Sequence, residues 1–169
     1  MKIDILTLFP EMFDGFINTS IIKRAIEKGL LEVNLINFRD YSPLNNKQVD
    51  DTPYGGGAGM VMEPTVVYDA YCSVKEPNVK VIYMSPQGKT LNQQMVQDLA
   101  KEENIILLCG HYEGVDQRIL DKIVDEEISI GDYVLTGGEI PAMVLIDSVS
   151  RYIDGVINKN SISEETFAN

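Results

Sequence analysis

The chain has 169 residues, 44% hydrophobic and 24% charged, which is the balance of a globular protein with one sizeable core. Its formal net charge of −12 argues against non-specific nucleic-acid binding, which needs clustered lysines and arginines, although a local basic face could still hold RNA. Cys72 and Cys109 form no CxxC pair and no apolar run approaches the ~18 residues of a membrane span, so we expect a cytoplasmic protein without disulfides.

Short apolar runs alternate with amphipathic stretches, which is typical of an α/β protein. In chain order we expect a strand at 3–9, a helix at 10–28, a strand at 31–38, a helix at 63–74, a strand at 79–84, a helix at 90–102, a strand at 104–110, a helix at 115–124, a weaker strand at 127–130 and a helix at 140–152. Pro10 and Pro64 suit first turns, and Gly29 suits a helix end. The apolar strands predict a mostly parallel sheet with helices on both faces.

Most glycines lie in three groups of loops that follow expected strands: 50–64, 85–90, and 109–118 together with 129–139. Ligands of open α/β sheets bind at the carboxyl ends of strands. Any one of these loops could be an ordinary turn, but the three together favour a binding site.

Two nucleotide-binding fingerprints fail on spacing. The G-x-x-x-x-G-K-[ST] pattern ending at Thr90 needs a glycine where Tyr83 stands. The glycines at 55–60 lack the full G-x-G-x-x-G spacing and follow a polar loop, which argues against a dinucleotide site. What remains is a pocket of backbone N–H and C=O groups. Such a pocket suits a ligand with an adenine edge and a ribose but no phosphates, and S-adenosylmethionine is such a ligand.

Five motifs, in the same order, resemble the bacterial tRNA (guanine-N1)-methyltransferases of the SPOUT superfamily. They are PYGGGAGMVMEP (53–64), MSPQGK (84–89), CGHYEGVDQR (109–118), SIGDYVLTGGEIPAMVLIDSVSR (129–151) and EETFAN (164–169). The resemblance implies methyl transfer from S-adenosylmethionine to N1 of guanosine 37, beside the tRNA anticodon. It also implies an α/β fold whose C-terminal part forms a deep trefoil knot, although unknotted connections are the general default.

The resemblance also implies a homodimer, with tRNA lying across both protomers and the catalytic loop of one completing the site of the other. Residues 1–160 would form the methyltransferase domain, and 161–169 would begin the catalytic loop and the linker. The tRNA-binding domain that usually follows in the family is expected to be absent.

Site residues follow from the resemblance, position by position. The residues expected around S-adenosylmethionine are Ser85, Pro86, Gly110, Tyr112, Ile130, Gly131, Asp132, Tyr133, Val134, Leu135, Gly137, Gly138 and Pro141. Glu113 would lie near the methionine end of the cofactor or the target guanosine. Glycines in these loops permit tight crossings and close approach of the backbone.

The chemistry needs few groups, because the methyl already sits on a positively charged sulfur. The enzyme must align N1 with it and remove the N1 proton. The family's base is an aspartate in a D-S-F-A stretch, and the matching residue is Glu165, which is one methylene longer. Glu164 is the competing candidate. Arg151 matches the arginine that contacts the base and orients the carboxylate.

Other residues suggest alternatives. His111, the single histidine, is interpreted as a loop contact, and Cys109 as a core residue without an acid–base partner. Asp50 and Asp51 are adjacent, and on extended backbone such carboxylates point to opposite sides. We therefore expect no protein-bound metal, while magnesium associated with RNA or with the active site is left open.

Two other functions compete with the first. One is a non-catalytic sensor of the cofactor or of RNA on the same fold. The other is a SPOUT methyltransferase for a different RNA position. A methyl-transfer assay and mapping of the methylated nucleotide separate them.

Overall fold

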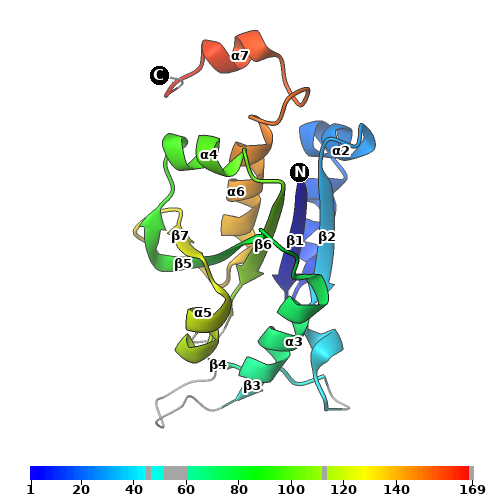
Figure 1. The fold of residues 1–169 in the computed structure, drawn as a ribbon, viewed down its shortest axis with the longest axis vertical. Coiled ribbons are helices and arrows are strands. Elements are labelled where there is room, and N and C mark those ends of the chain that lie inside the picture. Colours follow the sequence, from blue (N-terminus) through cyan, green and yellow to red (C-terminus); the bar gives the residue numbers. More distant parts are fainter. Residues whose placement is uncertain (45–46, 52–60, 112–113, 168–169) are drawn as a thin grey trace.

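The computed structural model describes residues 1–44, 47–51, 61–111 and 114–167 (Figure 1). The elements in these ranges are β1 (Lys2–Thr7), η1 (Pro10–Phe13), α1 (Asp14–Ile17), α2 (Ser20–Glu27), β2 (Glu32–Asn37), η2 (Phe38–Tyr41), β3 (Asp50–Asp51), β4 (Val61–Met62), α3 (Pro64–Val74), β5 (Lys80–Thr90), α4 (Gln93–Leu99), β6 (Asn104–Cys109), α5 (Gln117–Ile123), β7 (Glu126–Ser129), α6 (Glu139–Ser150) and α7 (Lys159–Ser163).

A five-stranded sheet forms the centre of the molecule, in the order β2-β1-β6-β5-β7. Every neighbouring pair is parallel. Each predicted strand therefore exists, and the mostly parallel sheet is confirmed. Because the strands are parallel, their carboxyl ends meet at one edge, and the loops after β5, β6 and β7 lie close together there.

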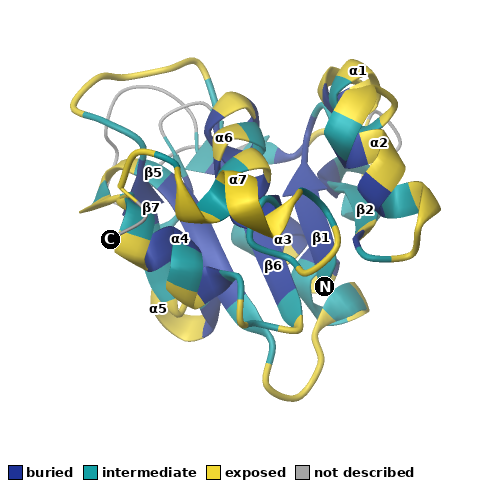
Figure 2. Ribbon diagram, turned by 90° about the horizontal axis from the view of Figure 1, so that it is seen from above, coloured by how far each residue is buried: buried dark blue, intermediate teal, exposed yellow. Residues whose placement is uncertain are grey.

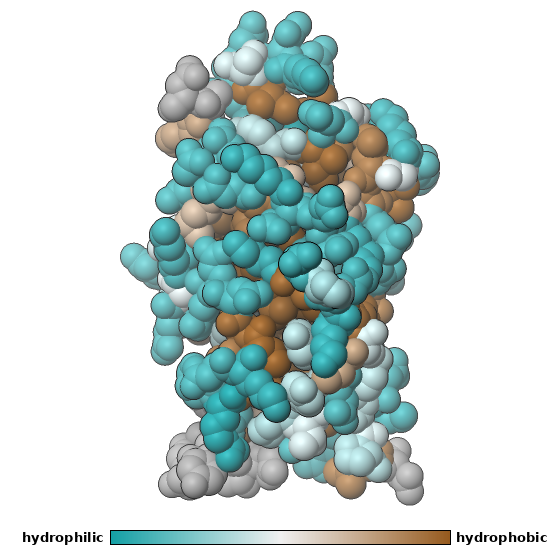
Figure 3. Space-filling view, in the orientation of Figure 1, coloured by the Kyte–Doolittle hydropathy of each residue, from teal (hydrophilic) through white to brown (hydrophobic). Residues whose placement is uncertain are grey.

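A hydrophobic cluster lies on each face of the sheet, and helices pack over both faces. Successive residues of β1 point to opposite faces, so Ile5 joins one cluster and Leu6 the other. The first cluster contains residues of α2, α4 and α6, and the second contains residues of α3 and α5. Figure 2 shows the strands buried between these layers and α7 largely exposed. The face drawn in Figure 3 is mostly hydrophilic, with hydrophobic side chains gathered in its middle.

Local signals explain where two helices begin or end. Pro64 begins α3, and the Glu63 side chain accepts a hydrogen bond from the Val66 N–H at 3.2 Å. Gly29 follows α2 with a φ of +72°, a left-handed conformation that glycine adopts without strain.

The prediction of a single helix at 10–28 was wrong, because these residues form three shorter helices, η1, α1 and α2. The break falls at Asn18 and Thr19, where Thr19 is extended and the Asn18 side chain donates to the Asp14 carbonyl at 2.8 Å. Short polar side chains compete with helical hydrogen bonds in this way.

The expected loop at 85–90 is also corrected, since β5 continues through it to Thr90. The register with β7 shifts between Met84 and Lys89, so residues between them bulge out of the ladder. A Cβ on Gly88 would lie 2.5 Å from the Glu127 carbonyl carbon, which shows how closely the two strands approach.

The other sequence-based expectations concern two adjacent aspartates, a cysteine, membrane-spanning helices and the knot. Asp50 and Asp51 form β3, which pairs with β4 in an antiparallel two-stranded sheet that the sequence did not predict. Cys109 is fully buried, and burial raises the pKa of its thiol well above the usual value, which agrees with a core role. Within the described part of the chain, the helices are all too short or too polar to cross a membrane. The trefoil knot stays a prediction.

Candidate cofactor pocket and catalytic pair

A pocket of about 410 Å³ opens at the carboxyl ends of β5, β6 and β7. It is lined by the bulge of β5, the residues after β6, the start of α5, and the segment between β7 and α6. Of the residues expected around the cofactor, those that line it are Ser85, Pro86, Gly110, Ile130, Gly131, Tyr133, Val134, Leu135, Gly137, Gly138 and Pro141. The structure thus brings three separate motifs to one cavity.

Five expected site residues are not in this set, and two of them, Arg151 and Glu165, are described below. Asp132 is exposed and does not line the pocket, although both of its neighbours in sequence do. Tyr112 and Glu113 lie outside the described residues, as do the glycines at 55–60.

The pocket also includes residues that the motifs did not single out. They are Tyr83, Met84, Gln87, His111, Gly114, Val115, Gln117, Leu120, Glu127, Ile128, Ser129 and Thr136. Several of them adjoin expected residues, so attention to whole motifs instead of selected positions would have found them. Leu120 and Glu127 lie on α5 and β7 at positions that only the tertiary fold brings to the site.

Two segments cross closely at the floor of the pocket. The Gly138 N–H donates to the Gly110 carbonyl at 3.1 Å. A Cβ on Gly138 would lie 2.9 Å from Cys109 Cα, and one on Gly110 would lie 2.9 Å from the Tyr83 hydroxyl oxygen. Two of the motif glycines are therefore required because backbone passes against backbone or against a buried ring.

A buried polar group adjoins this crossing. Glu139, only 1% exposed, accepts a hydrogen bond from the Thr7 hydroxyl at 2.9 Å, and its other carboxylate oxygen contacts His111 Nε2. The His111 ring meets Phe9 edge to face, with 4.9 Å between centroids. His111 is thus a loop contact, as expected, but its partner lies 28 residues away.

The wall formed by Tyr83 stays uncharged at physiological pH. Burial, reinforced by the Glu127 carboxylate, raises the pKa of Tyr83 to about 12. Its hydroxyl therefore serves as a hydrogen-bonding group and not as a phenolate.

The charge of the pocket limits what it can bind. Among the lining residues that the structure describes, none is a lysine or an arginine, and Glu127 is the one carboxylate. Phosphate groups would find no counter-charge there, whereas a positively charged sulfonium or ammonium would meet no repulsion. In the ranges described, no group of three or more His, Cys, Asp or Glu side chains could hold a metal ion.

Arg151, which directly follows α6, forms an ion pair with Glu165, which lies two residues after α7. Glu165 also accepts a hydrogen bond from the Tyr152 hydroxyl at 2.8 Å and one from Gln93 at 3.3 Å. The hydrogen bond from Arg151, followed by that from Tyr152, lowers the pKa of Glu165, so this carboxylate is ionised at neutral pH. Glu164, the competing candidate, is exposed.

This ion pair does not line the pocket of its own chain. Arg151 follows the C-terminal end of α6, while Gly138 and Pro141 of the pocket lie at the other end of that helix. A helix of 12 residues is about 18 Å long, which is more than one arginine side chain spans. Figure 1 shows α7 at one end of the molecule and α5, which contributes to the pocket, toward the other.

Comparison with known proteins identifies a family that this chain matches. The profile described as "tRNA (Guanine-1)-methyltransferase TrmD" matches residues 1–169. The tRNA (guanine-N(1)-)-methyltransferase of Ruminiclostridium cellulolyticum is 59% identical, with 100% of this chain and 74% of that protein covered. The Clostridioides difficile enzyme of the same name is 55% identical, with 99% of this chain and 74% of that protein covered.

A solved structure agrees with these matches. The crystal structure of the tRNA (m1G37) methyltransferase from Aquifex aeolicus has a TM-score of 0.86 and 45% identity, covering 94% of this chain and 72% of that one. The chain belongs to the tRNA (guanine-N1)-methyltransferase family.

Proposed function

We propose that this chain transfers the methyl group of S-adenosylmethionine to N1 of a guanosine in tRNA, and that the guanosine is nucleotide 37. Family membership supports the reaction, and the m1G37 specificity in the name of the Aquifex enzyme supports the position. The observation that carries the proposal is the pocket at the carboxyl ends of β5, β6 and β7, which collects the expected loops. A cytoplasmic location fits a tRNA substrate.

The composition of the pocket supports the cofactor. Adenine has donors and acceptors on its edge that backbone groups can match, and the segment around Ile130, Leu135 and Gly137 offers backbone together with apolar side chains. The absence of lysine and arginine from its described lining disfavours nucleotides with phosphates. We therefore propose S-adenosylmethionine as the ligand. No set of magnesium ligands is proposed, because the described residues offer none.

The proposed chemistry assigns one role to each member of the ion pair. Glu165, ionised and held by Arg151 and Tyr152, accepts the N1 proton while N1 attacks the methyl carbon. Loss of that proton places negative charge on guanine O6, which the Arg151 guanidinium can stabilise by donating to it. The bond that breaks joins the methyl carbon to sulfur, and S-adenosylhomocysteine leaves with both electrons of that bond.

The separation of this pair from the pocket supports a site shared between two copies. Apolar side chains remain exposed beside the pocket: Val134 is 83% exposed, Ile140 49% and Val144 42%. Ile140 and Val144 are four residues apart on α6, so they lie on one face of the helix. We propose that a second copy covers this face and that its Arg151 and Glu165 complete the pocket of the first.

The function is tested on the enzyme with unmodified tRNA transcripts carrying guanosine at position 37. S-adenosylmethionine and S-adenosylhomocysteine should raise the melting temperature, since a ligand that binds only the folded state stabilises it, whereas ATP and NAD should not. The methylated nucleotide is then mapped. Methyl transfer to another position would identify a different SPOUT specificity. Cofactor binding without methyl transfer to any RNA would favour the sensor. A melting temperature raised by ATP or NAD, but not by S-adenosylmethionine or S-adenosylhomocysteine, would refute the assignment of the pocket.

A further inference from the structure

We propose that His111 and Glu139 form a positioning pair that holds residues 130–138 against the carboxyl end of β6 and so pre-forms the cofactor pocket. The identity of the ligand rests on the proposed function, but the pair itself is inferred from its contacts. Neither residue is assigned to contact the reacting atoms.

The pair connects three segments that are far apart in sequence. Glu139 is the first residue of α6, Thr7 is the last residue of β1, and His111 follows the end of β6 by two positions. One carboxylate oxygen of Glu139 accepts from the Thr7 hydroxyl at 2.9 Å, and the other contacts His111 Nε2. Glu139 therefore ties the start of α6 to two strands of the central sheet.

Burial makes this contact costly to lose. Glu139 is 1% exposed, and a buried carboxylate is destabilising unless hydrogen bonds or an opposite charge compensate it. The N-terminus of the 12-residue helix α6 also favours negative charge at this position. With His111 donating to it, the carboxylate has a partner on each oxygen. Without His111 this buried oxygen of Glu139 loses its partner. That loss favours a rearrangement of the segment that the pair holds in place.

The pair also fills the space beside the pocket backbone. A Cβ on Gly137 would lie 2.5 Å from His111 Cε1 and 2.7 Å from Glu139 Oε1, so the two side chains pack directly on Gly137. His111 and Gly137 both line the pocket. Residues 132–136, which precede Gly137, are exposed, so their position depends on how the segment is fastened at its end.

The consequence is a specific division between binding and turnover. A ligand that binds a segment already in place does not have to order it, so fastening the segment increases affinity. Loss of the pair should therefore weaken cofactor binding, while a bound and saturated complex should still react. A merely structural role would lower stability without separating these two quantities.

The test uses the enzyme with tRNA and measures the Kd for S-adenosylmethionine by calorimetry and kcat at saturating cofactor. We expect His111→Leu to raise Kd about 10- to 100-fold, the range for removing a hydrogen bond to a buried charged group, with kcat within about threefold. His111→Gln keeps an N–H donor and should recover most of the affinity. Lys80→Gln, which removes an ion pair with Glu102 and Glu126 away from the pocket, is the matched control and should bind normally.

Amide hydrogen exchange protects the test against a variant that folds poorly. In His111→Leu the Gly138 amide should lose protection while amides of β1 keep theirs. An affinity within twofold of the unmodified enzyme, a lower kcat at unchanged Kd, or failure of His111→Gln to recover affinity would each overturn the proposal. Failure of the unmodified enzyme to bind S-adenosylmethionine would instead overturn the proposed function, so the two failures are distinguishable.

Discussion

Gly138→Ala tests whether the close crossing at the pocket floor determines cofactor binding. Gly138 has φ −86° and ψ −2°, a conformation that alanine adopts freely, so the added methyl acts by contact alone. Its Cβ would lie 2.9 Å from Cys109 Cα and 3.2 Å from the Gly110 nitrogen. Both are backbone atoms of a buried strand end, so neither can rotate away.

The magnitude follows from these distances. Carbon atoms in ordinary contact are about 3.5 Å apart, so the segments must separate by about 0.6 Å. The hydrogen bond from the Gly138 N–H to the Gly110 carbonyl, now 3.1 Å, would lengthen to about 3.7 Å and be lost. That loss costs about 1 kcal/mol, and overpacking costs about 1–3 kcal/mol. We expect about 2–4 kcal/mol of destabilisation in total, or a melting temperature lower by roughly 4–16 °C.

Calorimetry measures the effect on the pocket. Because the pocket wall moves with the crossing, the Kd for S-adenosylmethionine should rise by more than about tenfold. Gly15→Ala is the matched control, since Gly15 lies in α1 with nothing within 4 Å of its added Cβ, and it should neither destabilise the protein nor weaken binding. If Gly138→Ala binds the cofactor as tightly as the unmodified protein and melts within a degree of it, the crossing does not shape the pocket.

Three further predictions concern the ion pair, the dimer and a buried carboxyl. Glu165→Gln should lower kcat by about 100- to 10,000-fold at unchanged cofactor affinity, with Glu165→Asp active and Glu164→Gln silent; the reverse pattern would make Glu164 the base. Mixing Glu165→Gln chains with Gly138→Ala chains should restore activity, because one of the two shared sites in a mixed dimer is intact, and no recovery after subunit exchange would place each site within one chain. Burial raises the pKa of Asp4 despite a hydrogen bond from Asn34, so the folded state favours the protonated form. The stabilising protonation is complete at pH below the ordinary aspartate pKa and is lost as pH rises through the raised folded value, so Asp4→Asn should raise the melting temperature at pH 7 and not near pH 3. An unchanged difference across that pH range would contradict this.

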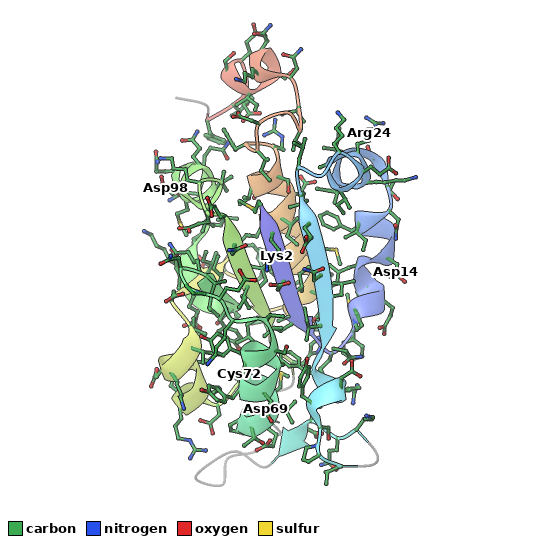
Figure 4. All side chains as sticks on the ribbon, turned by 45° about the vertical axis from the view of Figure 1, so that its right-hand side comes forward. Lys2, Asp14, Arg24, Asp69, Cys72 and Asp98 are labelled. Atoms are coloured by element: carbon green, nitrogen blue, oxygen red, sulfur yellow. The ribbon has the colours of Figure 1, made fainter. Side chains whose placement is uncertain are left out.

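The surroundings of Asp4 explain why burial disfavours the charged form of its carboxyl group. It lies on the sheet face that carries Leu6, and it is 3% exposed. Lys2, two residues earlier on β1, is engaged by Glu76 after α3, so its charge is shared between two carboxylates. Figure 4 shows Lys2 on β1 and Cys72 on α3, the two elements that meet on this face.

The parallel sheet was predictable because its signal is local. Strands such as 104–110 are continuous apolar runs, and burial on both faces of a sheet requires that pattern. The helix break at Asn18 was missed because the amphipathic pattern continues through it, while its cause is a short-range hydrogen bond from a side chain. The extension of β5 beyond Met84 was missed for the opposite reason, since Pro86 and Gly88 are typical of loops and only β7 makes them part of a strand.

The candidate site, like the fold, was predictable only in part from the sequence. Motif resemblance located the pocket residues because each lies within a contiguous stretch of sequence. The contact between His111 and Glu139 was not predicted, because 28 residues separate them and nothing local marks the pair. The one available signal was a carboxylate directly after Gly137 and Gly138 at a helix start, which alone indicates only a favourable charge at the first turn.

Helix α6 connects the features that matter for the proposed reaction. Its first residue, Glu139, contacts the pocket through His111, its exposed residues Ile140 and Val144 lie on one face, and Arg151 follows its last turn. A rigid helix fixes the spacing between these groups, so a chain cannot bring its own Arg151 to its own Gly138 without breaking α6. Two copies packed through the face of Ile140 and Val144 in antiparallel fashion would place the end of one helix beside the start of the other. That arrangement meets the requirement of the chemistry, which needs the carboxylate and the sulfonium methyl at the same N1 edge of one guanine.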